Sequence, residues 1–292
     1  MISTFVRSAL LVALSSAAAV ASATVTAQNT PKLEMPAASP TAKVEQRIGL
    51  TDFSVTYARP SVKGRKIFGE LVPYGQVWRT GANTSTAISF STAVKFGGAD
   101  VPAGKYALFT IPEAGEWTVI LSKVTGQWGA YTYDAKDDAV RVKVKPTKLV
   151  EAIETLELGF GSLRDDSATL DIRWETTRVS IPLAVDVVGV IVPQIEAAMK
   201  AEGKKPYFQA AMFFYEHDLD LKQALTWMDA GLAEQPEAFW MLYRKGLILE
   251  KSGDKKGAIA AAQQSLALAE KAQGGIKDEY MALNKALIAR CK

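Results

Sequence analysis

Residues 57–83 read YARPSVKGRKIFGELVPYGQVWRTGAN and continue from FSVTY (53–57), a stretch that alternates apolar and polar residues. The alternation predicts a β-strand with one buried face, and it stops where the long segment begins. The segment carries a net charge of +4, because five lysines and arginines stand against Glu70 alone. Its prolines and glycines indicate an irregular segment held by the elements around it.

A β pattern extends around this segment, from about residue 44 to residue 188. Glycine- and aspartate-containing turns separate the stretches ISF (88–90), VKF (94–96), KYALFTI (105–111), EWTVILS (116–122), VRVKVK (140–145), TLELGF (155–160), ATLDIRW (168–174) and VSIPLAVDV (179–187). With 53–57 they make roughly nine short strands without a long helix between them, which is typical of an antiparallel sandwich or barrel.

The pattern changes at Pro193, and residues 194–292 are rich in Ala, Leu, Lys, Glu and Gln. The pair Ala224 and Leu232 aligns with Ala258 and Leu266 at an offset of 34 residues. This period resembles that of tetratricopeptide repeats, in which stacked helical pairs bury small residues where they cross. We therefore predict a helical repeat region that could bind a protein partner.

The first 27 residues look like a secretory signal peptide, with Arg7, a short apolar run and small residues before two competing cleavage sites, after Ala23 and after Ala27. The apolar run is too short for the roughly 20 residues of a membrane span. Residues 28–42 contain three prolines and predict an exposed linker. We expect an exported bacterial protein, periplasmic or secreted, without a membrane span once the signal is removed.

The predicted fold class is thus α+β with two domains, an antiparallel β-sandwich at 43–190 and a helical repeat domain at 194–292. The single cysteine, Cys291, excludes an internal disulfide, so core burial must stabilise the chain. Removal of residues 1–27 would lower the net charge from +3 to +2, which argues against nucleic acid as a partner.

Four stretches of the β part resemble the bacterial domain-of-unknown-function family 2911: RPSVKGRKIFG (59–69), LVPYGQVWRTGAN (71–83), VPAGKY (101–106) and GQWGAY (126–131). The resemblance covers nearly all of the β part. It implies an exported protein, in some members with a tetratricopeptide-like tail, and it implies no established activity.

The residue types in the β part exclude several chemistries. Its lack of histidine and cysteine leaves no ligands for zinc or another transition metal, and we expect no cofactor. Asp134, Asp137 and Asp138 form a weak calcium candidate, because their spacing lacks an EF-hand glycine and a distal acid, and a solvated turn before the strand at 140–145 is the simpler explanation.

Enzymatic alternatives are few. The chain has no G-x-S-x-G elbow, and Ser61 with Lys63 is the only nucleophile–base pair near the signature. Glu70 is the only acid of the signature, whereas a glycosidase needs two facing carboxylates. We therefore assign no catalytic residues. An envelope hydrolase acting on glycan or peptidoglycan-type substrates stays an alternative.

Arginine and aromatic side chains make the signature a candidate ligand site, because a guanidinium binds carboxylate, phosphate or sulfate and stacks on rings. The candidate ligand-binding residues are Arg59, Lys63, Arg65, Tyr74, Trp78, Arg79 and Asn83. The opposing interpretation is a plug that closes the end of the sandwich, with its arginines bonded internally.

The leading hypothesis is a non-enzymatic module of the cell envelope that binds an anionic or carbohydrate-like ligand, or a protein. A purely structural assembly protein is the third alternative.

Overall fold

The structure is a computed structural model that describes residues 33–292, so the predicted signal peptide lies outside the described residues. In chain order the strands are β1 (Thr41–Ile48), β2 (Thr51–Ala58), β3 (Thr86–Phe90), β4 (Val94–Phe96), β5 (Ala99–Val101), β6 (Gly104–Ile111), β7 (Trp117–Ser122), β8 (Asp138–Val144), β9 (Thr147–Gly161) and β10 (Ser167–Val185). A 3-10 turn, η1 (Ala135–Asp137), precedes β8.

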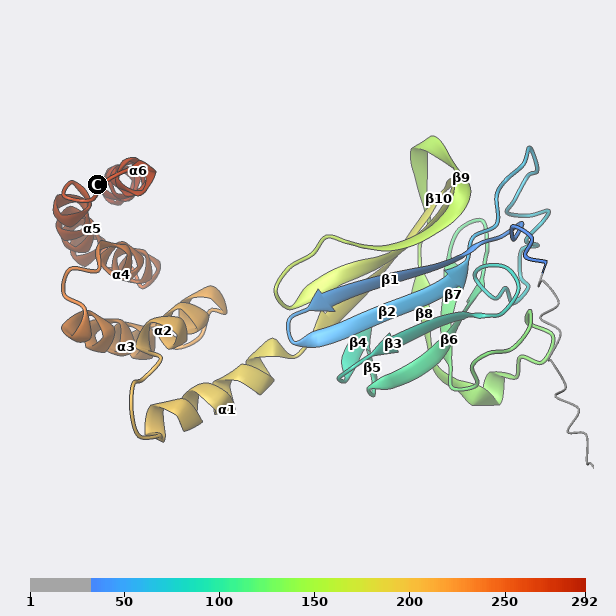
Figure 1. Ribbon diagram of the computed structural model, residues 1–292, viewed down its shortest axis with the longest axis horizontal. Helices are drawn as coiled ribbons and strands as arrows, with labels where there is room; N and C mark the ends of the chain where they lie inside the picture. The colour runs from blue at the N-terminus through green and yellow to red at the C-terminus, as the bar shows by residue number, and fades with distance from the viewer. Residues whose placement is uncertain (1–32) are drawn as a thin grey trace, which may run out of the picture. The chain divides into compact units, whose positions relative to one another are not determined.

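The helices follow the strands as α1 (Val187–Lys200), α2 (Tyr207–Glu216), α3 (Leu221–Glu234), α4 (Phe239–Lys251), α5 (Lys255–Ala269) and α6 (Gly275–Cys291) (Figure 1). Among residues 33–292, no helix is long and apolar enough to cross a membrane.

The strands form two antiparallel sheets. One has six strands in the order β1-β2-β3-β6-β7-β8, and the other has four in the order β5-β4-β10-β9. Figure 1 shows β1, β2, β3 and β6 running side by side. Both sheets contribute to a single core, because Val55 and Ile88 of the first and Leu170 and Ile181 of the second are all fully buried. The predicted antiparallel sandwich followed by helices is confirmed.

Residues 57–63 connect the two sheets at one edge. The Tyr57 hydroxyl accepts from the Leu158 N–H at 2.9 Å and donates to its carbonyl at 3.2 Å. Further along, the Leu156 N–H donates to the Pro60 carbonyl at 2.9 Å. The segment therefore satisfies the outer backbone groups of edge strand β9, which would otherwise be an open edge.

Four rings from distant parts of the chain meet below this segment. Phe68 contacts Trp117 edge-on at 4.8 Å between ring centroids, and Trp78 stacks on Trp174 at 5.8 Å. Phe68 also lies edge-on to Trp78 and Trp174. Each such aromatic pair stabilises the fold by about 0.5–1.5 kcal/mol beyond its buried area. This part of the signature segment is a plug built into the core.

Several element bounds differ from the prediction. Strand β1 begins at Thr41, inside the predicted linker, and β5 lies in a stretch predicted as a turn. Residues 168–174 and 179–185 belong to one strand, β10, whose pairing with β9 shifts register between Arg173 and Thr177. Helix α1 begins at Val187, so Pro193 lies inside a helix that spans the predicted boundary. A proline removes one helical hydrogen bond, but the bonds on either side of it continue the helix.

Helices α2 and α3, and then α4 and α5, form successive pairs with similar internal features. Asp220 caps α3 and Asp254 caps α5, 34 residues further on, each by accepting backbone N–H bonds. Ala224 and Ala258 follow at the same offset, and both are fully buried. These pairs agree with the predicted period, while membership of the tetratricopeptide class stays a prediction.

Candidate functional site

Two of the candidate arginines are occupied within the protein. Arg59 donates through Nε to the Leu156 carbonyl at 2.9 Å and lies 3.4 Å from a Glu157 carboxylate oxygen. Arg65 donates to the carbonyls of Val62 at 3.0 Å and Ser61 at 2.6 Å. Both guanidinium groups hold the start of the signature segment in place, which agrees with the plug interpretation.

Three further candidates lie apart from one another. Trp78 is 8% exposed and donates its indole N–H to the Gly81 carbonyl, so it belongs to the core and leaves the candidate set. Lys63 is exposed at a left-handed turn with φ of 49°. Tyr74 is 44% exposed and lines a separate hollow, described below.

Arg79 has a different environment from the other two arginines. Its side chain is partly buried, and among residues 33–292 no carboxylate forms an ion pair with it. Its Nε is buried and has no hydrogen-bond partner within the described part. Desolvation by burial lowers the pKa of Arg79, while the nearby Tyr131 phenol opposes that shift. A guanidinium stays charged even so, and an unpaired, partly buried charge is costly to the fold.

Arg79 and Asn83 lie on the first of two loops that backbone hydrogen bonds join. We call residues 79–86 and 125–131 the loop pair. The Ser85 N–H donates to the Gln127 carbonyl at 2.8 Å, and the Gly129 N–H donates to the Asn83 carbonyl at 3.0 Å. The loop pair is therefore a fixed structure rather than two independent loops.

The backbone of the loop pair contains strained and glycine-dependent positions. Thr80, a β-branched residue, has φ of 54° in the left-handed region, and Asn83 has φ of 59°. Gly129 has φ of 68°, and a Cβ there would lie 2.6 Å from Cε2 of Tyr131. Strained residues of this kind concentrate at functional sites.

Two large rings project from the second loop into solvent. Trp128 is 65% exposed and Tyr131 is 85% exposed. We did not predict either as a site residue, although both stand in the signature stretch GQWGAY, where flanking glycines are the signal that could have identified them. Exposed rings beside a guanidinium can stack on the face of a sugar or a base.

A hollow of about 290 Å³ adjoins the loop pair on the outer face of the six-stranded sheet. Its lining combines the Asn83 amide, the Lys105 ammonium and the hydroxyls of Thr41, Thr56, Thr84, Ser85 and Thr125. No aspartate or glutamate is among the described residues that line it. The hollow therefore offers cationic and hydroxyl groups and no opposing acid.

Two more buried polar atoms of the loop pair lack partners. The Ser85 hydroxyl and the Gln127 side-chain carbonyl have no hydrogen bond to any described residue. Buried polar atoms are nearly always hydrogen-bonded, so an unpartnered one calls for an explanation such as water or a ligand. With Arg79 Nε, three of them lie in the loop pair.

The loop that follows the pair is fastened to the sheet by Tyr133. Its hydroxyl donates to Asp138 at 2.8 Å and accepts from Arg141 at 2.6 Å, and its ring contacts Phe109. Burial, and then the Asp138 carboxylate, raise the pKa of Tyr133 to about 12. This contact holds the second loop of the pair against the outer face of β6.

The chemistries considered as alternatives find little support in the geometry. Asp134 caps η1 and Asp138 pairs with Arg141, and residues 33–292 contain no group of three or more acids, histidines or cysteines that could hold a metal ion. The Ser61 hydroxyl bonds the Thr155 hydroxyl at 3.1 Å rather than a base.

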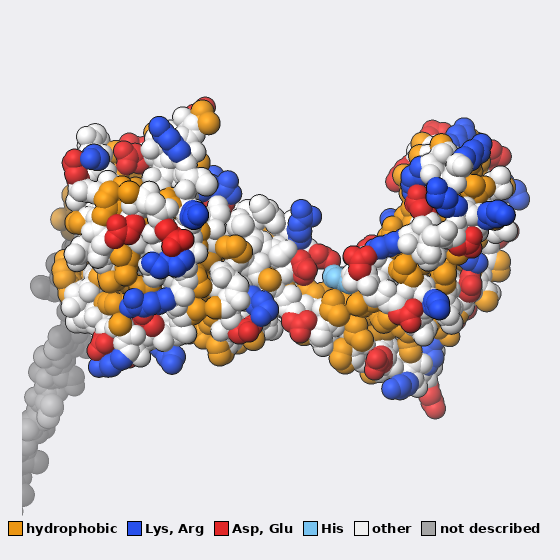
Figure 2. Space-filling model, turned by 180° about the vertical axis from the view of Figure 1, so that it is seen from behind, with side chains coloured by type: hydrophobic (Ala, Val, Ile, Leu, Met, Phe, Trp, Pro, Cys, Tyr) orange, Lys and Arg blue, Asp and Glu red, His pale blue; other side chains and the backbone are white. Residues whose placement is uncertain are grey.

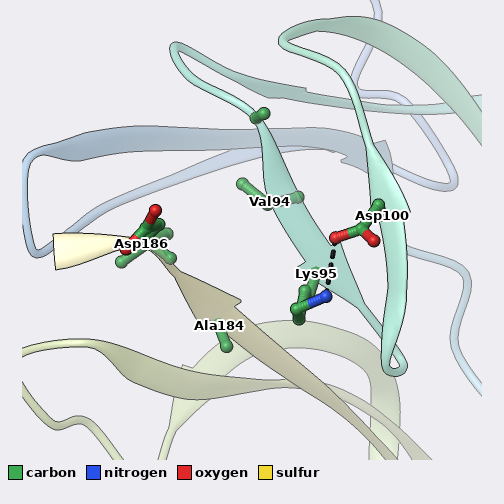
Figure 3. Close-up of a pocket in the computed structure, with 7 residues that line it drawn as sticks. Val94, Lys95, Asp100, Ala184 and Asp186 are labelled. Atoms are coloured by element: carbon green, nitrogen blue, oxygen red, sulfur yellow. Dashed lines mark hydrogen bonds and ion pairs between the residues drawn. The ribbon is translucent and has the colours of Figure 1, made fainter. Parts of the chain in front are cut away.

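A larger hollow, of about 530 Å³, lies where β4, β5 and the end of β10 meet (Figure 3). Its Lys95 and Asp100 pair with each other at 2.7 Å, and Asp186 caps α1 by accepting from the Gly189 N–H. Its charged groups are already satisfied, and the loop pair does not contribute to it.

Charges are mixed on the face of the molecule that Figure 2 shows. Acidic and basic side chains of the described residues are interspersed there, without a broad area of one sign. That face therefore has no extended charged area that would attract an anion from a distance.

Comparison with known proteins finds one family match, and it covers the β-domain. Residues 39–183 match the model of a family described as Protein of unknown function (DUF2911). The match includes both loops of the loop pair and ends before α1. It supports the family predicted for the β-domain and says nothing about the helices. No curated protein and no solved structure matches the chain.

Proposed function

We propose that this DUF2911 protein is an exported, non-enzymatic binding module whose loop pair takes a ligand with an anionic group and hydroxyls. The observation that carries the proposal is Arg79, a partly buried guanidinium that pairs with no acid among residues 33–292. A ligand carboxylate, phosphate or sulfate would supply the missing partner through paired N–H bonds.

The surroundings of Arg79 narrow the chemistry of the ligand. Trp128 and Tyr131 offer ring faces, and the adjoining hollow offers hydroxyls, the Asn83 amide and the Lys105 ammonium. An acidic sugar presents a ring face, hydroxyls and a negative charge together, and it therefore fits better than a simple anion. The exported compartment predicted from residues 1–27 would expose the site to envelope glycans.

A thermal-shift screen tests the proposal. It would compare inorganic phosphate and sulfate, uronic acid oligosaccharides, the matching neutral oligosaccharides and peptidoglycan fragments. A specific ligand stabilises the native state by mass action, so it raises the unfolding midpoint, and the rise grows with the ratio of free ligand to its dissociation constant. We expect acidic saccharides to raise the midpoint more than their neutral counterparts do.

Variants test whether a ligand-induced rise of the unfolding midpoint comes from binding at the loop pair. Arg79→Ala should weaken binding by roughly 10- to 100-fold, the loss of about 1.5–3 kcal/mol for a hydrogen bond to a charged group. Trp128→Ala should weaken saccharide binding more than phosphate binding. Arg65→Ala is the matched control, because Arg65 is an exposed arginine that bonds only to loop carbonyls. Equal shifts in wild type and Arg79→Ala would reject the proposal.

The helices are proposed to bind a protein partner, as helical repeat stacks do. The support is the 34-residue offset shared by the caps Asp220 and Asp254 and by the buried Ala224 and Ala258. Deletion of 187–292 should then abolish partner capture in cross-linking experiments while leaving the ligand-induced thermal shift in place.

A further inference from the structure

A second hollow, of about 280 Å³, lies where four segments of the β-domain meet. These are the 68–74 part of the signature segment, the turn between β6 and β7, the turn between β8 and β9, and residues 176–177 of β10. None of the described residues of the loop pair lines it, so it is separate from the site at Arg79.

The floor of this hollow is apolar and rigid. Phe68 and Trp117 line it, with ring centroids 4.8 Å apart, and Trp174 supports Phe68 from behind at 6.1 Å. Trp117 is 1% exposed, so its ring is held on nearly all sides by the core. Phe68 is 6% exposed, so a ligand would meet a small and fixed apolar area.

Two glycines make room for groups on the rim. Gly69 has φ of 91°, and a Cβ there would lie 2.9 Å from Cε2 of Tyr74. Gly75 has φ of 74°, and its Cβ would lie 3.3 Å from a carboxylate oxygen of Glu113. A larger residue at either position would displace the phenol or the carboxylate, so the rim depends on glycine at both.

The rim carries opposite charges that do not neutralise each other. Glu113 and Lys148 both line the hollow, and neither forms an ion pair with the other or with any residue among 33–292. Glu113 stands on the turn between β6 and β7, and Lys148 stands at the start of β9. An exposed ion pair contributes too little to draw these two segments together. Thr147, Thr176 and Thr177 also line the hollow, and their hydroxyls are further hydrogen-bonding groups.

We propose that this hollow binds a small zwitterion, namely an amino acid or a short peptide with both termini free. The ligand ammonium pairs with Glu113, the ligand carboxylate pairs with Lys148, and the apolar part lies on Phe68 and Trp117. The volume corresponds to the liquid volume of roughly nine water molecules, which suits a dipeptide better than an oligosaccharide.

Isothermal titration calorimetry of the full chain tests this with three peptides. Alanyl-alanine carries both charges, N-acetyl-alanyl-alanine lacks the ammonium, and alanyl-alaninamide lacks the carboxylate. We expect alanyl-alanine to bind and each blocked peptide to bind at least about tenfold more weakly. Equal binding of the three peptides, or no binding of alanyl-alanine, overturns the proposal.

Two variants test which rim side chain binds each end of the ligand. Glu113→Gln should remove the preference for the free ammonium and keep the preference for the free carboxylate, and Lys148→Met should do the reverse. Both side chains are exposed, so the variants should keep the wild-type unfolding midpoint. Lys95→Met is the control, because Lys95 is an exposed lysine paired with Asp100 elsewhere. Arg79→Ala should leave peptide binding unchanged, which separates this proposal from the one above. The assignment is wrong if Glu113→Gln keeps the preference for the free ammonium and Lys148→Met keeps the preference for the free carboxylate.

Discussion

Among the arginines of the described part, Arg79 alone combines a buried Nε that has no hydrogen-bond partner with the lack of a paired acid. Six of them form ion pairs, and Arg59 and Arg178 among these reach acids held on β9 and β10. Arg79 is partly buried without an acid, and its Nε is unpartnered. A residue that costs stability in the unliganded protein is better explained by binding than by folding.

Replacement of Arg79 by methionine should therefore not weaken the unliganded protein. Arg79→Met keeps an apolar stem and removes the buried charge, so the free energy of unfolding should stay the same or rise by up to about 1 kcal/mol. Urea unfolding followed by tryptophan fluorescence measures this.

Arg178→Met is the control for that experiment, because Arg178 bonds Asp171, which is only 6% exposed. It should lower the free energy of unfolding by about 1–3 kcal/mol, since it leaves a buried carboxylate oxygen unpaired. A loss of that size for Arg79→Met would mean that Arg79 serves the fold.

The raised pKa of Tyr133 predicts that the free energy of unfolding depends on pH in the alkaline range. Its folded-state pKa of about 12 lies above the ordinary value of 10.0, so the native protein holds the phenol proton more tightly than the unfolded chain does. The resulting stability is present below pH 10 and is lost as the pH rises from 10 toward 12. Tyr133→Phe should show a smaller loss of unfolding free energy than wild type over that interval. Identical pH profiles would contradict the role given to the Tyr133–Asp138 bond.

At the scale of elements, the segment between β2 and β3 has two separate roles. Its first part, residues 57–63, covers the edge of β9 with backbone and side-chain hydrogen bonds. Its last part, residues 79–83, enters the loop pair and carries the unpaired guanidinium. The plug, formed by the buried Phe68 and Trp78 between these two parts, and the proposed binding loop are thus different stretches of one segment.

The covered edge gives a prediction about Tyr57, which is 4% exposed. Tyr57→Phe leaves the buried N–H and carbonyl of Leu158 without their partner, so the free energy of unfolding should fall by about 1–3 kcal/mol. Tyr131→Phe, at an 85% exposed side chain, should change it by less than about 0.5 kcal/mol. Chemical denaturation of both variants checks this, and equal stabilities would show that the Tyr57 bonds do not hold the edge.

The strands were predictable where alternation is strong and long enough. FSVTY and VRVKVK alternate cleanly, and both lie in strands, β2 and β8. Strand β5 has three residues, too few to show a period, and in β1 the inward positions include Gln46, which weakens the pattern. Pairing across long separations, such as Arg59 with Glu157, cannot be inferred from local pattern, because it depends on which edges meet after folding.

The same limit applies to the site. Arg59, Arg65 and Arg79 look alike in the sequence, and only their tertiary partners distinguish them. Asn83 was predicted next to Arg79, whereas Trp128 was missed because it joins the site through backbone bonds from a loop more than 40 residues away. The signature stretches indicate the part of the chain that contains the candidate site. The burial and the hydrogen-bond partners of each side chain then determine which of these residues can bind a ligand.

At the scale of the molecule, the β part and the helical part have separate cores. The core shared by the two sheets contains no described residue beyond β10, and two further clusters contain only helical residues. Each part therefore buries its own apolar surface.

This separation predicts that residues 38–186 fold alone. The fragment should show a cooperative unfolding transition and the same ligand-induced shift as the full chain, both measurable by differential scanning fluorimetry. A fragment that is unfolded by circular dichroism would show that the β part needs the helices, and a folded fragment without the ligand shift would place the site elsewhere.

Ligand binding at Arg79 is tested most directly by an NMR titration of the labelled protein with the acidic saccharide that gives the largest thermal shift. We predict that the Arg79 Nε–H and Trp128 indole resonances move together with added ligand, while those of Arg59, Arg65 and Trp78 stay in place. Movement at Arg59 or Arg65 with Arg79 unchanged, or no movement at any of the five, would contradict it.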